Sequence, residues 1–430
     1  MSPNGKKLVV ISMDAMIGED LETAKTLPTY GYMLRHGALV KDIREIYPTL
    51  TYPSHTTMLS GCYPDKHGVV SNYQEIPGCA DLPWNWYHHI VKTKDLMDAA
   101  KKAGMTTASV SWPVTGNHPS VDYLVDEIWA MGADSTMDDL FSVFLAAGTP
   151  QFLMEATVAQ HMELRMKRKQ PETAWFSTYV ASDIIREYAP DVITVHLANI
   201  DNYRHRFGVY SEEAKNGVLE SEEMLRTIVE AVRYTGFMSV TDFVITSDHG
   251  QIDAERTAKP NLLLLENGLI DVNAEGTVTG CRAWCYGLDG SAHVVLQDPQ
   301  DWETYSRVEK ILRDACADGK HGIGRVYTAE EAQKEERLSG NMSFVLETDG
   351  KTAFSGGWTG EYFAYKKKGT HGHHPDKGPD PFFLGFGPSF KEGAVLPAAR
   401  LVDEAPTCAK VLGLELPADI DGVPLLEMLR

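Results

Sequence analysis

The sequence of 430 residues has few cysteines and no long hydrophobic run. The six cysteines form no CxxC pair, and Cys281 and Cys285 lack histidine partners at zinc-finger spacing. This scarcity favours reduced thiols over a disulfide framework, as in a cytoplasmic protein. No run approaches the ~20 apolar residues that span a bilayer, and Leu8–Met13 is too short for the core of a signal peptide. We therefore expect a cytoplasmic protein without a membrane partner.

Positive charge is also scarce. The chain has 40 Lys and Arg against 60 Asp and Glu, a formal net charge of -20. Polymeric nucleic acid and anionic membranes both require a basic surface, so the sequence argues against either as a partner. Small anions are still compatible with this charge, because a bound metal ion reverses the local field. The expected partner is a small molecule, and the oligomeric state is open.

Apolar runs of strand length alternate with helix-period segments along the chain. The strand candidates are Leu8–Met13, Thr106–Trp112, Val192–Leu197, Asp242–Thr246 and Pro381–Phe386. Helical periodicity runs from Trp175 to Tyr188 and from Met224 to Val232, with Ser221 as a candidate N-cap and Gly236 just past the end. This alternation predicts an α/β fold with a mostly parallel central sheet and helices on both faces.

The alternation stops between residues 254 and 368. A short alternating strand at His293–Gln297 and a helix around Tyr305–Ala315 indicate a smaller α+β unit there. We expect a catalytic α/β core of residues 1–253 and 369–430, and an inserted lobe of residues 254–368. A second excursion from the core pattern, Tyr73–Gln170, gives no clear elements.

Residue types that bind metals follow or closely precede these apolar runs. They are Asp14, Asp201, His205, Asp248, His249 and His371. Ligands of open α/β sheets bind outside the carboxyl ends of the strands, so residues far apart in the sequence are expected to meet at one sheet edge. An Asp248-His249-Gly250 turn or a capping Asp14 would be unremarkable alone; together the six predict a metal centre.

Three carboxylates and three imidazoles suit zinc, manganese or iron better than calcium or magnesium. Six ligands are too many for one tetrahedral zinc ion and suit two ions in one site. Two ions about 4 Å apart can stabilise the attacking and leaving oxygens of a phosphoryl displacement. We expect two divalent metal ions, zinc first, with manganese or iron as open alternatives.

A hydroxyl group in the segment from Tyr47 to Asn72, YPTLTYPSHTTMLSGCYPDKHGVVSN, is the candidate nucleophile. Pro53 is tolerated in the first turn of a helix, so a helix is expected over Ser54–Ser60. Thr51 would then lie at the helix N-terminus, where the dipole and a metal ion favour its alkoxide. The alternative is that Thr51 only caps the helix.

Several ordered segments resemble the alkaline phosphatase superfamily, most closely its nucleotide pyrophosphatase/phosphodiesterase branch. Besides the segment just quoted, they are VVISMDAM, SWPVTG, HLANIDNYRHRFG, VITSDHGQ, GTHGHHP and APTCAKVLGLELPADIDGVPLLEML. They extend from residue 9 to residue 428, so the resemblance covers nearly the whole chain.

The resemblance implies a role for each matching residue. Thr51 corresponds to the nucleophile, held by the metal ion whose ligands are Asp14, Asp248 and His249. The second metal ion, which activates water, has the ligands Asp201, His205 and His371. Asn72 and the backbone N–H of Tyr52 would donate to a phosphoryl oxygen, and the Tyr52 ring would pack against the leaving group or base. Leu50 and Ser54 replace a lysine and an asparagine common in relatives that act on nucleotides.

The resemblance thus implies a two-metal hydrolase that cleaves phosphodiester or pyrophosphate bonds through a phospho-threonine intermediate. The alternatives are a phosphonoacetate hydrolase or phosphomonoesterase of the same superfamily, or a non-catalytic α/β binding module. We expect His55 and His67 to be structural, and His373 and His374 to lie at the rim of the site unless one of them is a ligand. The run Lys366–Lys368 is either a solvated face or a contact for an anionic substrate.

Overall fold

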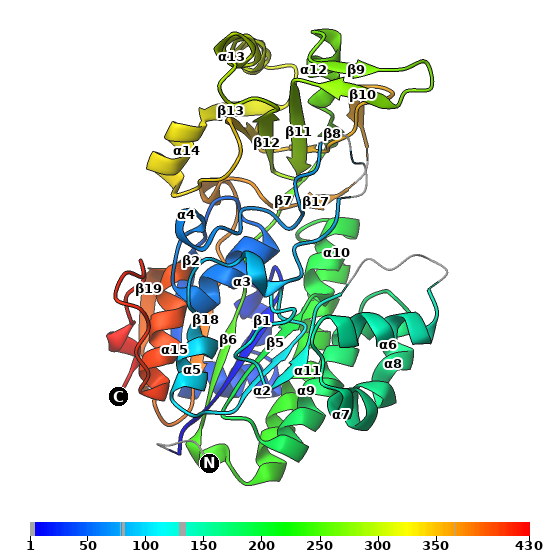
Figure 1. Cartoon of the computed structure of the whole chain (residues 1–430). Coiled ribbons are helices and arrows are strands. Elements are labelled where there is room, and N and C mark those ends of the chain that lie inside the picture. Colours follow the sequence, from blue (N-terminus) through cyan, green and yellow to red (C-terminus); the bar gives the residue numbers. More distant parts are fainter. Residues whose placement is uncertain (1–4, 78, 80–81, 129–134, 366) are drawn as a thin grey trace.

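An eight-stranded sheet forms the centre of the protein (Figure 1). The computed structural model describes residues 5–77, 79, 82–128, 135–365 and 367–430. In spatial order the strands are β19 (Val395–Arg400), β2 (Ala38–Arg44), β18 (Phe383–Phe386), β6 (Thr241–Thr246), β1 (Lys7–Met13), β5 (Val192–Leu197), β3 (Thr107–Val110) and β4 (Tyr123–Val125). Only β18 runs antiparallel to its neighbours in this sheet, so the carboxyl ends of the other strands share one edge.

Helices cover both faces of the sheet, because successive side chains of a buried strand point to opposite faces. On β1, Val9 and Ile11 belong to one apolar cluster, and Leu8 and Val10 belong to the other. The first cluster is completed by α2 (Pro28–His36), α9 (Glu172–Tyr188) and α11 (Glu212–Thr235). The second is completed by α3 (Thr51–Ser60), α5 (Leu96–Lys102) and α15 (Glu404–Leu412).

The remaining core helices are shorter. They are α1 (Leu21–Ala24), α4 (Pro64–His67), α6 (Met137–Ala146), α7 (Gln151–Leu153), α8 (Ala159–Met166) and α10 (Asn199–Phe207). Single turns of other helix types occur at Gly18–Asp20, His88–Ile90, Met154–Val158, Met238–Val240, Pro375–Lys377, Leu401–Asp403 and Leu426–Met428. Of the described helices, none is both long and apolar enough to cross a membrane.

A smaller α+β lobe lies above the carboxyl edge of the sheet (Figure 1). Its largest sheet is antiparallel, with the order β11 (Ala283–Leu288), β12 (Ser291–Leu296), β14 (Phe344–Thr348), β13 (Ile323–Thr328). The other lobe strands are β8 (Arg256–Ala258), β9 (Ile270–Val272), β10 (Val278–Cys281), β15 (Thr352–Phe354) and β16 (Phe363–Ala364), and its helices are α12 (Asn261–Glu266), α13 (Trp302–Ala317) and α14 (Ala329–Glu336). The lobe has its own apolar cluster.

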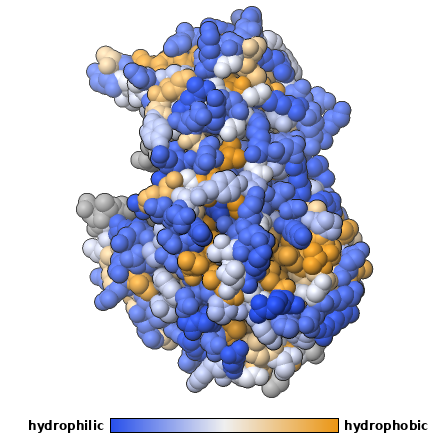
Figure 2. Space-filling view, turned by 180° about the vertical axis from the view of Figure 1, so that it is seen from behind, coloured by the Kyte–Doolittle hydropathy of each residue, from blue (hydrophilic) through white to orange (hydrophobic). Residues whose placement is uncertain are grey.

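Two short antiparallel strands, β7 (Ile252–Asp253) and β17 (Gly369–Thr370), pair where the chain enters and leaves the lobe. Seen from behind, the surface narrows between the lobe and the core, and hydrophilic residues cover most of the lobe (Figure 2). The His371 loop therefore starts at the junction of the two parts.

The structure confirms the predicted α/β architecture and finds a strand at each of the five predicted positions. Three strands of the central sheet were missed because they carry weak signals: β2 alternates with exposed charged residues, β4 is three residues long, and β19 has no buried residue and contains a proline. The candidate N-cap Ser221 was wrong. Helix α11 begins at Glu212 and is capped by Ser211, whose Oγ accepts the N–H of Ala214. The first turns of α11 are polar and were therefore hidden from an apolar pattern.

Gly236 ends α11 in the left-handed region, at φ 78°, as its position past the helix predicted. A Cβ at this position would meet no atom within 4 Å, so a substitution tests backbone conformation alone. We expect Gly236→Ala to lower the free energy of unfolding by about 1 kcal/mol, measured by urea denaturation. Gly236→Asn is the control, because asparagine tolerates this conformation better. Equal stability of Gly236→Ala and the parent protein would contradict the prediction.

Candidate metal centre

The six predicted metal ligands and Thr51 meet at the carboxyl edge of the central sheet. Asp14 follows β1, Asp201 and His205 lie on α10 just after β5, and Asp248 and His249 follow β6. The three strands are neighbours, so their ends deliver these side chains to one place. Thr51 is the first residue of α3, and His371 directly follows β17. Two groups of donor atoms share Asp201: Asp14, Asp201 and His249 form one, and Asp201, His205 and His371 form the other. Asp248 forms a third group with His55 and His196.

The first cluster surrounds the Nε2 atom of His249. Thr51 Oγ1 lies 3.1 Å from this nitrogen, Asp248 Oδ2 lies 3.2 Å away and Asp14 Oδ1 lies 3.4 Å away. The other ring nitrogen, Nδ1, donates to the backbone oxygen of Gly250 at 3.1 Å. In the neutral ring Nε2 therefore carries a lone pair and no proton.

The lone pairs of His249 Nε2 and of the Asp14 and Asp248 oxygens therefore face one another with too few hydrogen-bond donors between them. Asp14 Oδ1 and Asp248 Oδ2 are buried and have no hydrogen-bond partner in the described part of the chain. Unpaired buried carboxylate oxygens cost free energy, and a cation placed among these atoms would remove that cost. The residues therefore fit a divalent metal ion.

The second cluster surrounds Oδ1 of Asp201. His205 Nε2 lies 3.2 Å from this oxygen and His371 Nε2 lies 3.8 Å from it. The Nδ1 atom of His205 donates to Gly369 O at 2.9 Å, and that of His371 donates to Thr49 O at 3.0 Å. These backbone acceptors fix the tautomers and direct both Nε2 lone pairs at Asp201, as in the metal-binding histidines of known metalloproteins.

The two clusters are close enough to form one centre. Donor atoms of Asp14, Asp201 and His249 all lie within 4.8 Å of one another. The His249 and His371 rings are stacked with their centroids 3.9 Å apart. Two ions bound in these clusters would be neighbours, which is the geometry that phosphoryl displacement by two metal ions requires.

Burial shifts the protonation equilibria of the donors. It raises the pKa of Asp248 to about 6 and that of Asp14 well above its usual range. It also lowers the pKa of His249 and of His371 to about 3 each. Desolvation thus favours the neutral form of every one of these four groups. Neutral imidazoles are the form that binds metals, and a bound cation would restore the carboxylates.

Thr51, Tyr52 and Asn72 lie at the start of α3 and beside it. The N–H of Tyr52 donates to Asn72 Oδ1 at 2.9 Å, so this N–H is paired within the protein and differs from the expected phosphoryl donor. The Tyr52 side chain is only 1% exposed, and its ring packs against Trp84 with centroids 5.3 Å apart. His55 Nδ1 donates to Thr51 O at 2.8 Å, which fits a structural role for His55.

Four buried polar residues around the centre were missed by the sequence analysis: Glu45, Glu127, His196 and Gln251. The Gln251 side chain donates to Asp201 Oδ1, and the N–H of Gly250 donates to Glu45 Oε1. His196 carried a usable signal, because it is a histidine within the otherwise apolar run of β5. Glu127 carried no such signal, because the residues around it show neither strand nor helix periodicity.

His373, which was expected at the rim of the site, is fully buried. His374 Nε2 pairs with Glu336 Oε1 at 3.0 Å. Lys367 pairs with Asp289, with the Nζ–Oδ2 distance 2.8 Å. Lys366 lies outside the described residues. The His374–Glu336 pair links the segment before β18 to the lobe, whereas the Lys367–Asp289 pair lies within residues 254–368.

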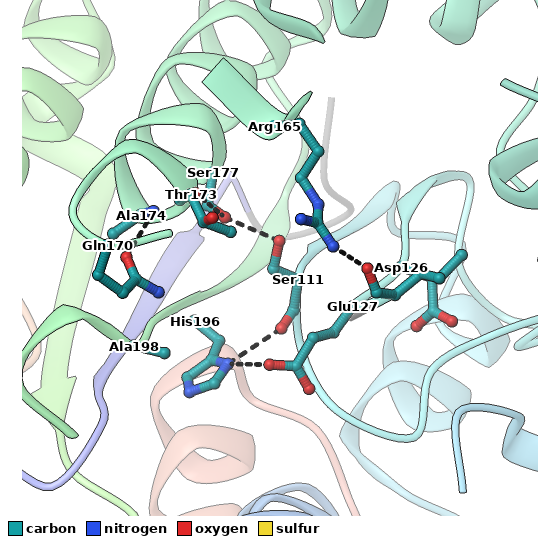
Figure 3. Close-up of a pocket in the computed structure, with 11 residues that line it drawn as sticks. Ser111, Asp126, Glu127, Arg165, Gln170, Thr173, Ala174, Ser177, His196 and Ala198 are labelled. Atoms are coloured by element: carbon teal, nitrogen blue, oxygen red, sulfur yellow. Dashed lines mark hydrogen bonds and ion pairs between the residues drawn. The ribbon is translucent and has the colours of Figure 1, made fainter. Parts of the chain in front are cut away.

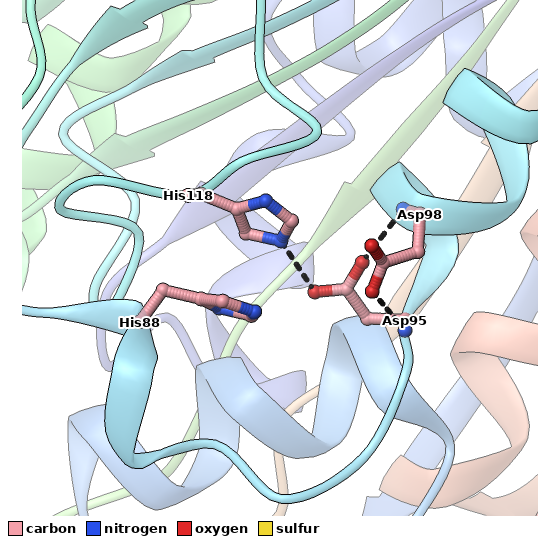
Figure 4. Close-up of side chains that lie close together, drawn as sticks. All are labelled: His88, Asp95, Asp98 and His118. Atoms are coloured by element: carbon pink, nitrogen blue, oxygen red, sulfur yellow. Dashed lines mark hydrogen bonds and ion pairs between the residues drawn. The ribbon is translucent and has the colours of Figure 1, made fainter.

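A further group of metal-binding residue types lies near the N-terminus of α5 (Figure 4). Here His118 Nδ1 accepts the N–H of Ser120 at 3.0 Å, so Nε2 carries the proton that it donates to Asp95 Oδ2 at 2.9 Å. Asp95 and Asp98 form the capping box of α5. The His118 tautomer is thus the reverse of that in the metal centre, and the group is a helix cap.

The fold and this donor set define an α/β protein whose sheet edge carries neighbouring clusters of residue types that bind divalent cations. Residues 8–375 match the family model described as type I phosphodiesterase / nucleotide pyrophosphatase. The chain belongs to this family.

Curated relatives agree with this assignment. Ectonucleotide pyrophosphatase/phosphodiesterase family member 3 of Rattus norvegicus is 20% identical, over 90% of this chain and 40% of that protein. Family member 7 of the same species is 23% identical, over 99% of this chain and 87% of that protein. The venom phosphodiesterase of Naja atra is 21% identical, over 90% of this chain and 41% of its own length.

This chain spans about two fifths of the length of the first two curated relatives it matches, the rat family member 3 and the cobra enzyme. A structure of an inactive variant of murine ectonucleotide pyrophosphatase / phosphodiesterase 5 in complex with AMP has a TM-score of 0.68. It is 16% identical and covers 99% of this chain and 100% of its own. This likeness confirms the fold.

Metal content tests the two clusters separately. We expect Asp248→Asn and His371→Gln each to lose about one of two bound zinc ions per chain, because each removes a donor from a different cluster. Elemental analysis after equilibrium dialysis measures the ratio. His374→Gln is the matched control and should keep both ions, since His374 pairs with Glu336 at the rim. Full zinc content in both ligand variants would overturn the scheme.

Proposed function

We propose that the chain is a metal-dependent hydrolase that cleaves phosphodiester or pyrophosphate bonds of small molecules through a phospho-threonine intermediate. The observation that carries this proposal is the position of the Thr51 hydroxyl, 3.1 Å from His249 Nε2 and at the N-terminus of α3. Membership of the type I phosphodiesterase / nucleotide pyrophosphatase family supports it. The AMP complex of the murine neighbour supports a nucleotide-like substrate, whereas Leu50 and Ser54 keep other diesters open.

Two metal ions, zinc first among the candidates, would be held by Asp14, Asp248 and His249 in one cluster and by Asp201, His205 and His371 in the other. When bound, they would lower the pKa of the threonine hydroxyl and of water and offset negative charge on the phosphoryl group.

The chain's own groups perform the bond changes. Thr51 Oγ1 loses its proton to solvent and attacks phosphorus, the bond to the leaving oxygen breaks, and the phosphoryl group with its remaining ester substituent becomes bonded to Thr51. Water then attacks the same phosphorus from the side that the leaving group vacated and frees Thr51. The dipole of α3 stabilises negative charge at Thr51 in both steps. Asn72 Oδ1 accepts the Tyr52 N–H, so Asn72 Nδ2 is the group that would donate to a phosphoryl oxygen.

We propose that residues 254–368 form an inserted lobe, with the catalytic core in residues 1–253 and 369–430. The β7–β17 pair supports this division, because Asp253 and Gly369, which flank the lobe in sequence, pair with each other. For the compartment, the free thiols Cys62, Cys281, Cys285, Cys316 and Cys408 support the cytoplasmic location expected from the sequence.

Removal of the Thr51 hydroxyl tests the nucleophile. We expect Thr51→Ala to lower turnover of bis-nitrophenyl phosphate more than about a thousandfold, because no other group would form the covalent intermediate. Zinc content should stay near that of the parent. Ser60→Ala, which removes another buried hydroxyl from the far end of the same helix, is the control and should keep activity. Undiminished turnover by Thr51→Ala would refute the mechanism.

The substrate class is tested by comparing this diester with the matching nitrophenyl monoester. A higher kcat/KM for the diester is the expected result. A preference for the monoester would instead support the phosphomonoesterase alternative.

A further inference from the structure

A row of buried polar residues runs across the carboxyl edge of the sheet, away from the metal centre. Figure 3 shows the His196 ring between Ser111 and Glu127. His196 lies in β5, Ser111 directly follows β3, and Glu127 lies just beyond β4. The sheet order is β6, β1, β5, β3, β4, so these residues continue the line that starts with His249 and Asp14. The mechanism proposed above gives Glu127 and His196 no role.

The His196 ring links this row to the metal centre. Its Nε2 lies 3.0 Å from Asp14 Oδ2, and its Nδ1 lies 3.1 Å from Glu127 Oε1 and 3.2 Å from Ser111 O. His196 is 2% exposed and Glu127 is 4% exposed. Each side of the ring is held by an oxygen acceptor, so the ring cannot turn without losing contacts on both sides.

Ser111 contributes through a strained backbone. Its φ is +55°, which is uncommon for a residue other than glycine. Its side chain contacts Ser177 Oγ at 2.8 Å, and its N–H donates to Val125 O at 2.7 Å. These contacts hold the Ser111 carbonyl toward His196. Such strain persists only where the surroundings determine the conformation, and it occurs often at functional sites.

These contacts determine the orientation of the Asp14 carboxylate. Its Oδ2 is engaged by His196, while its Oδ1 has no hydrogen-bond partner and lies 3.4 Å from His249 Nε2. We propose that Glu127 and His196 are positioning residues: they orient Asp14 so that one oxygen faces the cluster of Asp14, Asp248 and His249, and thereby set the affinity of that cluster for its divalent cation. This inference rests on the proposed metal centre. It assigns a function to two residues that touch neither the metal-facing oxygen nor the nucleophile.

Zinc affinity measured at each cluster is the test. Outer-shell partners of metal ligands typically contribute 10- to 100-fold to metal affinity. We expect Glu127→Gln to weaken one zinc site about tenfold and His196→Asn to weaken the same site about tenfold or more, in competition titrations of the full chain with a chromophoric chelator. The other site, formed by Asp201, His205 and His371, should change less than about twofold. Equal weakening of both sites, or of neither, would overturn the proposal.

Two further variants separate positioning from general damage. Asp126→Asn is the matched control, because Asp126 is an equally buried carboxylate next in sequence that contacts Thr115; it should leave both sites unchanged. The double variant Glu127→Gln/His196→Asn should bind zinc as His196→Asn does, because Glu127 acts through His196. Additive losses would show that Glu127 acts by another route.

The result is independent of turnover. Thr51→Ala reports on the proposed reaction, whereas site-selective zinc binding reports on Asp14, so each proposal can fail without the other. If circular dichroism shows that Glu127→Gln does not fold, His196→Asn alone decides the question. Unchanged zinc affinity at its second site then shows that the damage is local. The visible spectrum of the cobalt-substituted protein gives a second readout, since reorientation of Asp14 changes the ligand field at one site only.

Discussion

The crowding of lone pairs around His249 Nε2 is the constraint on which the rest of the structure depends. Carboxylate oxygens of Asp14 and Asp248 and the hydroxyl of Thr51 approach this nitrogen within 3.1–3.4 Å. The tautomer that Gly250 imposes leaves no ring proton between them. A buried group of this kind is costly without a cation, so the protein keeps it only if a cation is part of its working state.

The sheet supplies the means to hold these atoms together. Parallel neighbours β6, β1 and β5 end at one edge, and each contributes donors from the first residues beyond the strand or from the helix that follows it. His371 arrives from the opposite direction, after the lobe, and backbone oxygens of Thr49 and Gly369 fix the two histidine rings of the second cluster. The lobe and the core therefore join close to the centre, at the β7–β17 pair.

Hydrogen bonds and ion pairs between buried polar groups extend beyond the candidate metal ligands. On the far side of Asp14, His196, Ser111 and Glu127 continue the line across β5, β3 and β4. The group of His88, Asp95, Asp98 and His118 contains the same residue types as the metal centre. The two differ in their hydrogen bonds, which decide whether the histidine Nε2 atoms can bind a cation. There a backbone N–H occupies Nδ1 and turns the ring into a donor for a helix cap. In the metal centre backbone oxygens occupy Nδ1 and leave the lone pairs on Nε2.

The sequence by itself determined the α/β class, the five main strands and the set of candidate ligands. Apolar runs of strand length and the polar residues that flank them are local features, so they can be read without a structure. The antiparallel direction of β18, the weak edge strands and the burial of Tyr52 under Trp84 depend on contacts between distant segments. So do the histidine tautomers and the link from Glu127 to Asp14. Only the tertiary structure decided these, because a backbone acceptor or a neighbouring strand far along the chain has no signature in the local sequence.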